Sequence, residues 1–209
     1  MKKGIRRLLV TSVVCLLPML AGLLLYARLP ADIPIHWNAN GEVDNTASKA
    51  FAVFAMPAIL CGLNLVVHVV LGSDPKRRGA SKVLRGVGFW AIPVLSLLSC
   101  SICYLAALGV EVPVSVLLPV LLGLMIIVIG NYLPKCRQNY TVGIKLPWTL
   151  HSEENWNRTH RFAGYVWMIG GAIMMLVSFF SLWYVQVGVI LLLALLPCVY
   201  SFVLYKKRV

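Results

Sequence analysis

Residues 112–133, VPVSVLLPVLLGLMIIVIGNYL, decide the fold of this chain. The stretch contains no Asp, Glu, Lys or Arg, and it matches the length of about 20 residues that an α-helix needs to cross a bilayer. A charged side chain at the bilayer centre costs about 2.5–3.5 kcal/mol on insertion scales. The stretch therefore predicts a membrane-spanning helix.

Five further apolar runs of similar length accompany it, at about residues 8–27, 50–72, 86–108, 162–183 and 184–204. All 26 charged residues lie outside the six runs. With 60% hydrophobic and 12% charged residues, the composition excludes a soluble globule and a disordered chain. We predict an all-α integral membrane protein with six transmembrane helices.

The distribution of Lys and Arg predicts the orientation. Of the 19 cations, 17 lie in the two chain ends and in residues 73–85 and 134–161, and the opposite side holds only Arg28 and Lys49. Because cytoplasmic loops carry the excess of Lys and Arg, both termini are expected inside the cell. The net charge of +12 then follows from topology and attraction to anionic lipids, without direct binding of nucleic acid.

Two polar segments are long enough to carry a function, residues 28–49 outside and 134–161 inside. Each follows the first span of a three-span half. An odd number of spans gives the halves opposite orientations, which is the pattern of a 3+3 inverted repeat. By sequence character, we divide this single membrane unit into a two-span module, 1–85, and a four-span module, 86–209.

The outer segment contains LPADIPIHWNANGEVD at residues 29–44. Its prolines favour an extended chain, and residues 38–41 predict a turn. We therefore expect a stiff strap on the outer membrane surface, with Thr46 or Ser48 capping the second span.

Four residues of the strap are the expected outer binding residues: His36, Trp37, Asn38 and Asp44. Trp37 suits the membrane interface. The spacing of His36, Glu42 and Asp44 matches no established zinc pattern, so we expect neither a metal nor a cofactor.

The inner segment reads GNYLPKCRQNYTVGIKLPWTLHSEENWNRTHRFAG at residues 130–164. Gly143 permits a backbone with positive φ. Ser152 is the expected N-cap of a helix whose first turn is acidic. We expect a loop, a short interfacial helix and then the fifth span, with Trp148 and Trp156 at the level of the lipid head groups.

Acid–base or metal chemistry is an alternative at both segments, through His36 with Asp44 or His151 with His160. The inner spacing is not H-E-x-x-H, and a capped amphipathic helix explains these residues without catalysis. We therefore predict a protein that is not an enzyme. Asn64 and His68 share one face of the second span, where an interhelical hydrogen bond is expected.

The two quoted segments resemble known sequences. The outer one is similar to an N-terminal module of unknown function found in many bacterial membrane proteins, and the inner one resembles the signature of the SdpI immunity family. The family pattern falls on these positions: Gly130, Asn131, Asn139, Gly143, Pro147, Trp148, Thr149, Leu150, Glu154, Trp156, His160 and Arg161. The expected inner binding residues are these positions without Gly130 and Leu150, together with Tyr140 and Lys145. Lys145-Leu146 departs from the family's Arg-Thr, and Lys lacks the planar bidentate contact of Arg.

The resemblance implies a multi-pass protein of the bacterial cytoplasmic membrane that protects its cell from a secreted peptide toxin. It also implies toxin and a cytosolic repressor protein held at the membrane as partners, and the cations of the inner segment add membrane lipids. A small transporter that exports an amphipathic molecule is the alternative, because an inverted repeat is typical of transporters.

Overall fold

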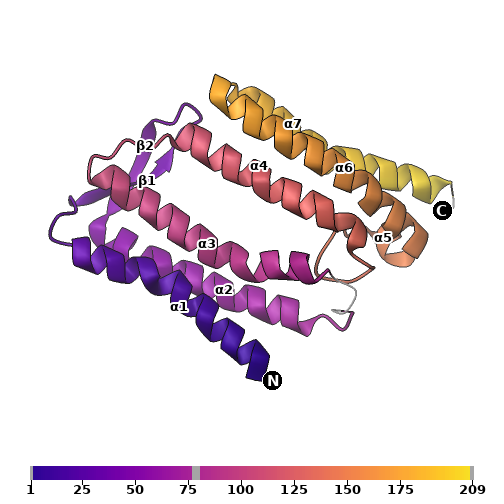
Figure 1. The fold of residues 1–209 in the computed structure, drawn as a ribbon, viewed down its shortest axis with the longest axis horizontal. Helices are drawn as coiled ribbons and strands as arrows, with labels where there is room; N and C mark the ends of the chain where they lie inside the picture. Colours follow the sequence, from indigo (N-terminus) through magenta and orange to yellow (C-terminus); the bar gives the residue numbers. More distant parts are fainter. Residues whose placement is uncertain (1, 77–80, 208–209) are drawn as a thin grey trace. The chain divides into compact units, whose positions relative to one another are not determined.

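The computed structural model describes residues 2–76 and 81–207. Arg77, Arg78 and Arg208, which count towards the predicted inner charge, lie outside these ranges. Six described helices are long and apolar enough to cross a membrane, which confirms the predicted number of spans. In Figure 1 they are α1 (Lys2–Leu25), α2 (Met56–Ser73), α3 (Lys82–Ala107), α4 (Val114–Tyr132), α6 (Glu153–Val177) and α7 (Trp183–Lys206).

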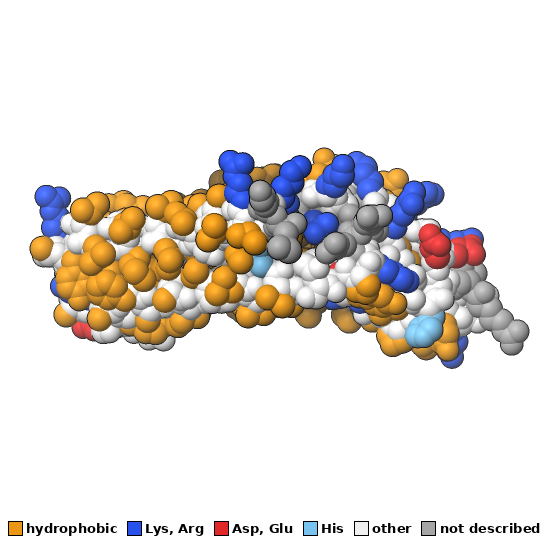
Figure 2. Space-filling model, turned by 90° about the horizontal axis from the view of Figure 1, so that it is seen from below, with side chains coloured by type: hydrophobic (Ala, Val, Ile, Leu, Met, Phe, Trp, Pro, Cys, Tyr) orange, Lys and Arg blue, Asp and Glu red, His pale blue; other side chains and the backbone are white. Residues whose placement is uncertain are grey.

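The outward faces of these helices are apolar. Large hydrophobic side chains are exposed along them, including Leu24 at 86%, Val69 at 66% and Leu176 at 66%. In Figure 2, hydrophobic side chains cover much of the face shown, and the charged side chains gather in a few places. Soluble proteins rarely expose so much contiguous apolar surface, whereas lipid-facing helices require it.

The chain separates into two compact units, Met1–Leu71 with Gly86–Val114 and Gly72–Arg85 with Ser115–Val209. Each unit holds most of three spans. The modules 1–85 and 86–209, which follow sequence character, stay a prediction. The inverted repeat and the inward orientation of both termini also stay predictions.

The outer segment of unit 1 folds into a hairpin. Strands β1 (Asp32–Trp37) and β2 (Val43–Ser48) pair antiparallel, with Pro34 opposite Thr46. The sequence predicted the extended backbone but not this pairing, so the all-α class holds for the spans and the hairpin is an addition to it. Just beyond the two strands, the Lys49 N–H donates to the Ala31 carbonyl oxygen at 2.8 Å. Hydrogen-bonded and non-hydrogen-bonded pairs alternate along an antiparallel ladder, so the pair of Pro34 with Thr46 is a non-hydrogen-bonded one. The nitrogen of Pro34 therefore points away from β2, and a proline is tolerated at such a position.

A buried apolar cluster lies beneath the hairpin. It comprises Leu29, Ile33, Ala52, Val53, Cys100, Cys103 and Tyr104. The chain enters α2 through a π-helical turn, η1 (Phe51–Ala55), and the Ser48 Oγ accepts the Phe51 N–H at 3.3 Å. This contact supports Ser48, the last residue of β2, as the predicted cap of the second span, whereas Thr46 lies two residues earlier in the strand.

Lys49, one of the two predicted outer cations, closes the end of α1. Its Nζ donates to the carbonyl oxygens of Tyr26 and Leu29, each at 3.2 Å, and lies 4.6 Å from the centre of the Tyr26 ring. Both carbonyls lie in the turn that follows α1, and the negative end of the helix dipole also favours a cation there. Lys49 therefore joins the base of the hairpin to the C-terminal end of α1.

A polar contact joins α1 and α2 in the middle of unit 1. The buried Asn64 donates through Nδ2 to the hydroxyls of Thr11 and Ser12, each at 3.2 Å. His68 Nδ1 lies 3.0 Å from the Asn64 carbonyl oxygen. The expected interhelical hydrogen bond is thus confirmed.

In unit 2, α4 and α6 approach each other through glycines. A Cβ added at Gly130 would lie 2.9 Å from the Gly164 carbonyl oxygen, and one added at Gly171 would lie 2.5 Å from the Gly123 carbonyl oxygen. Such backbone contact needs small residues, as is common between membrane helices. The two glycine pairs therefore set the distance between these two helices.

The fifth span differs from its predicted bounds. The expected short interfacial helix and the span 162–183 form one continuous helix, α6, which begins at Glu153 and ends at Val177. A 3-10 turn, η3 (Ser178–Phe180), and Ser181 at φ 54° then reverse the chain. The sequence does not reveal this turn, because residues 178–182 contain no charged residue, glycine or proline.

Candidate functional site

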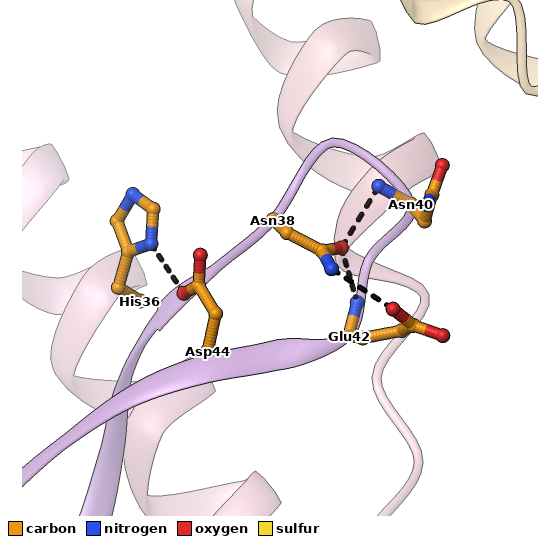
Figure 3. A network of polar contacts seen from close by, with 5 residues as sticks. All are labelled: His36, Asn38, Asn40, Glu42 and Asp44. Atoms are coloured by element: carbon orange, nitrogen blue, oxygen red, sulfur yellow. Dashed lines mark hydrogen bonds and ion pairs between the residues drawn. The ribbon is translucent and has the colours of Figure 1, made fainter.

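The outer hairpin exposes a His–Asp pair (Figure 3). His36 Nδ1 lies 2.5 Å from Asp44 Oδ1, and the two side chains are 65% and 42% exposed. Because an ionised carboxylate only accepts hydrogen bonds, Nδ1 carries the proton and Nε2 is left for another partner. The fold thus brings two of the four predicted outer residues together on an open surface.

The other two outer residues are structural. Asn38 Oδ1 accepts the N–H groups of Asn40 and Glu42, at 2.9 and 3.0 Å, and its Nδ2 donates to Glu42 Oε2 at 2.9 Å. Asn38 therefore forms the turn between the strands, which confirms the predicted turn. The partly buried Trp37 packs against the apolar cluster beneath the hairpin.

The inner segment is a folded loop organised around Asn139. Its fully buried side chain accepts the N–H groups of Thr141 and Val142 through Oδ1, at 3.0 and 2.7 Å. Its Nδ2 donates to the carbonyl oxygens of Arg137 and Val142, each at 2.9 Å. This one amide satisfies four backbone groups of the 137–142 turn, so it builds the loop and is not open to a ligand.

Two further side chains fasten the short helix α5 (Pro147–His151). Gln138 Nε2 donates to the carbonyl oxygens of Thr149 and Leu150, at 2.9 and 2.8 Å. The buried Thr149 hydroxyl accepts the Leu146 N–H at 2.9 Å. Gln138 of the loop therefore holds the C-terminal part of α5, and the helix's own Thr149 caps its start.

Trp156 and His160 form the floor of the loop. The fully buried Trp156 donates through Nε1 to the Cys136 carbonyl oxygen at 2.7 Å, and its ring stacks on His160 with centroids 4.0 Å apart. His160 Nδ1 donates to the Trp156 carbonyl oxygen at 2.8 Å, and Nε2 accepts the Ile144 N–H at 3.0 Å. Both nitrogens are occupied, so the ring is a neutral structural element and not a proton-transfer group.

A polar network joins the loop to α7. Trp148 donates through Nε1 to the Ser201 Oγ at 2.6 Å. Ser201 in turn donates to Asn155 Oδ1 at 2.9 Å, and Asn155 Nδ2 returns a bond to the Ser201 carbonyl oxygen at 3.0 Å. The Trp148 ring also lies against Phe202 and Tyr205. Trp148 therefore holds α5 against α7.

The predicted inner residues fall into three groups by exposure. Asn139, Thr149, Trp156 and His160 are buried and shape the loop, while Gly143 and Trp148 are partly exposed. The exposed members are Asn131, Tyr140, Lys145, Pro147, Glu154 and Arg161. Only the exposed group can meet a partner directly, and the buried group holds it in place.

Two exposed residues, Glu154 and Arg161, share a depression of about 410 Å³ on α6. Glu153, Asn157 and Arg158 complete its lining, and Arg158 pairs with Glu154 at 2.6 Å. The depression offers both signs of charge, which suits a polar protein segment or a lipid head group.

The suggested inner catalytic residues do not act together. His151 Nδ1 bonds the Pro147 carbonyl oxygen at 2.5 Å, Glu154 pairs with Arg158, and both nitrogens of His160 are engaged within the loop. The alternative of a membrane enzyme using His151 with His160 therefore has no support in this geometry.

The sequence reasoning missed several residues that hold the loop, among them Asp74, Gln138, Asn155 and Ser201. Asp74 is only 4% exposed, and its carboxylate binds the turn at Tyr140 and Thr141. A signal was present, because Asp74 is the one acidic residue in the basic segment 73–85. A lone acid among cations at the end of a span is a candidate for a buried contact.

Comparison with known families identifies this folded loop. Residues 135–201, which comprise most of the loop, α5, α6 and most of α7, match the family described as SdpI/YfhL. This part of the chain is thus similar to the SdpI/YfhL family. Residues 13–61, which include the hairpin, match a Domain of unknown function (DUF1648). Asp74 lies in neither matched range.

A relative extends the family match over the whole chain. The Immunity protein SdpI of Bacillus subtilis (strain 168) is 28% identical over 210 residues, which cover 99% of this chain and 98% of the relative. No solved structure matches the chain. The SdpI/YfhL segment and the DUF1648 segment therefore occur here in one chain whose length is close to that of the relative.

Proposed function

We propose that this chain is an immunity protein of the bacterial cytoplasmic membrane that protects its cell from a secreted peptide toxin. The observation that carries the proposal is the full-length similarity to the Immunity protein SdpI, which includes both matched segments. The six apolar helices support a membrane location. Neither matched family is described as an enzyme.

The two polar segments have different roles in this proposal. The exposed His36–Asp44 pair on the predicted outer side meets the toxin. On the predicted inner side, Tyr140, Lys145, Pro147, Glu154 and Arg161 meet a cytosolic repressor or anionic lipids. The buried residues of the loop keep that surface in one shape.

Survival of a deletion strain tests the proposal. Cells that lack the gene, exposed to supernatant from toxin-producing cultures of the same species, are expected to survive at least about tenfold less well than the parent. A plasmid copy should restore survival. Unchanged survival of the deletion strain contradicts the proposal. Gradient-dependent movement of an amphipathic molecule in proteoliposomes, together with unchanged survival, favours the transport alternative.

Variants separate the two surfaces. His36→Ala is expected to reduce protection while leaving the amount of protein in the membrane unchanged, because the side chain is exposed and contributes little to folding. Lys145→Ala should leave protection intact and reduce any repressor recovered with the membrane fraction. His151→Ala is the matched control, since this histidine is exposed and belongs to neither predicted binding set.

A further inference from the structure

Asp74 follows directly on α2, and its carboxylate binds a distant part of the chain. Oδ1 accepts the Lys76 N–H at 2.8 Å. Oδ2 accepts the Thr141 hydroxyl at 2.7 Å and the Tyr140 N–H at 3.2 Å. These bonds fasten the connection between α2 and α3 to the inner loop, and both partners belong to unit 2.

The carboxylate is charged in this buried place. Burial alone raises the pKa of the Asp74 carboxyl, but hydrogen bonds from the Thr141 hydroxyl and from the N–H groups of Lys76, Tyr140 and Thr141 outweigh it and hold the pKa below its usual value. Hydrogen bonds to an ionised acceptor are stronger than those between neutral groups. The contact is therefore a firm anchor at cytoplasmic pH.

Asp74 and Asn139 hold the same turn from two sides. Asn139 Oδ1 binds the N–H groups of Thr141 and Val142, while Asp74 binds the Tyr140 N–H and the Thr141 hydroxyl. The residue displayed between them is Tyr140, which is 49% exposed. The Lys76 amine lies 5.1 Å from the centre of the Tyr140 ring and donates to Gln138 Oε1 at 3.3 Å.

We infer that Asp74 is a positioning residue of the inner site, which fixes the turn that displays Tyr140 to a partner. The site is then composite, because it needs a residue from the α2–α3 connection, outside both matched segments. The biological consequence rests on the proposed function.

The native Cys136 reports on this turn. Its thiol is buried, accepts the Asn139 Nδ2–H at 3.2 Å and lies 3.6 Å from the Val142 carbonyl oxygen. Burial raises the pKa of this thiol, so it reacts slowly with maleimides in the intact loop. Loosening of the turn exposes it.

The test measures labelling of Cys136 by N-ethylmaleimide in membranes, with modified peptides quantified by mass spectrometry. Asp74→Asn replaces one acceptor oxygen by a donor, and Thr141→Val removes the bonded hydroxyl. Each is expected to speed labelling of Cys136 by about tenfold or more. Thr141→Ser keeps the hydroxyl and should label like the parent. Labelling of Cys198 in α7 should stay unchanged, because the spans remain folded.

The outcomes are distinct. Equal Cys136 labelling in Asp74→Asn and the parent overturns the inference, as does equal labelling of Thr141→Val and Thr141→Ser. If Asp74→Asn does not accumulate, the two Thr141 variants decide. None of these measurements uses toxin, so the labelling results remain valid even if the immunity assay fails. If the proposed function holds, Asp74→Asn and Thr141→Val should also lose repressor binding or protection while they remain in the membrane.

Discussion

Gly143 lies so close to the His160 imidazole that a methyl group at residue 143 would collide with Nε2 and press on the Trp156 ring. Gly143 also has a φ of 123°, which L-residues rarely adopt. The backbone at this point therefore permits the stacked Trp156–His160 pair beneath it. Gly143 lies within the matched range 135–201, at a point where an added Cβ would collide with its neighbours.

Gly143→Ala is expected to unfold the inner loop locally. The strained backbone costs about 1–3 kcal/mol, and the collision with His160 adds to it. Gly109→Ala is the matched control, because Gly109 also has a positive φ of 81° but has no atom within 4 Å of an added Cβ. Limited proteolysis in detergent should cut the inner loop much faster in the Gly143→Ala variant than in the Gly109→Ala variant. Equal rates would show that the collision is unimportant.

Helix packing in unit 2 should be sensitive to the glycine pairs. Gly171→Leu places a side chain against the Gly123 carbonyl oxygen and Ile127, so α4 and α6 must separate. Gly188→Leu on α7 meets open space and is the control. We expect a fall in the thermal unfolding midpoint in detergent for Gly171→Leu and little change for Gly188→Leu. Similar midpoints in the two variants would contradict the close approach of α4 and α6.

Trp148 should hold α5 through its hydrogen bond as well as its ring. Trp148→Phe keeps an aromatic ring near Phe202 and Tyr205 but leaves the Ser201 hydroxyl without its donor. The expected loss is about 1 kcal/mol. Ser201→Ala removes the acceptor, so the double variant should lose less than the sum of the single changes. Additive losses, measured by unfolding in denaturant, would mean that the two groups do not interact.

The Asp74 anchor predicts a direction of pH dependence. Its folded pKa lies below the ordinary value of 3.8, so its stabilisation is complete above that value and is lost as the pH falls through the folded pKa. The unfolding midpoint of the parent should therefore drop more between pH 6 and about pH 3 than that of Asp74→Asn. An equal fall of the midpoint in the two proteins would show that the ionised Asp74 carboxylate does not stabilise the folded state.

The sequence was sufficient for features that depend on local chemistry. Charge exclusion located the six spans, because a charge in lipid costs more than a helix can tolerate. Ser152 was recognised as an N-cap, and its Oγ does accept the Asn155 N–H at 3.1 Å. Asn38 was recognised within a turn from its neighbours.

Features that depend on distant partners were missed. The hairpin requires the pairing of β1 with β2. The sequence of β2, VDNTAS, lacks the alternation of apolar and polar residues that would predict a strand. Asp74 needed Thr141, which is far away in the chain. The end of α6 at Val177 was hidden because residues 178–182, SFFSL, contain no charged residue, glycine or proline. In each case the deciding contact is tertiary, and local propensity does not encode it.

The central claim is that the hairpin and the folded SdpI/YfhL loop face opposite sides of the membrane, with the loop inside. Its most direct test is labelling of single introduced cysteines, Glu42→Cys on the hairpin and Lys145→Cys on the loop, with an impermeant maleimide. Both positions are exposed. The account expects Glu42→Cys to react in intact cells and Lys145→Cys to react only after permeabilisation. Labelling of Lys145→Cys in intact cells would contradict it.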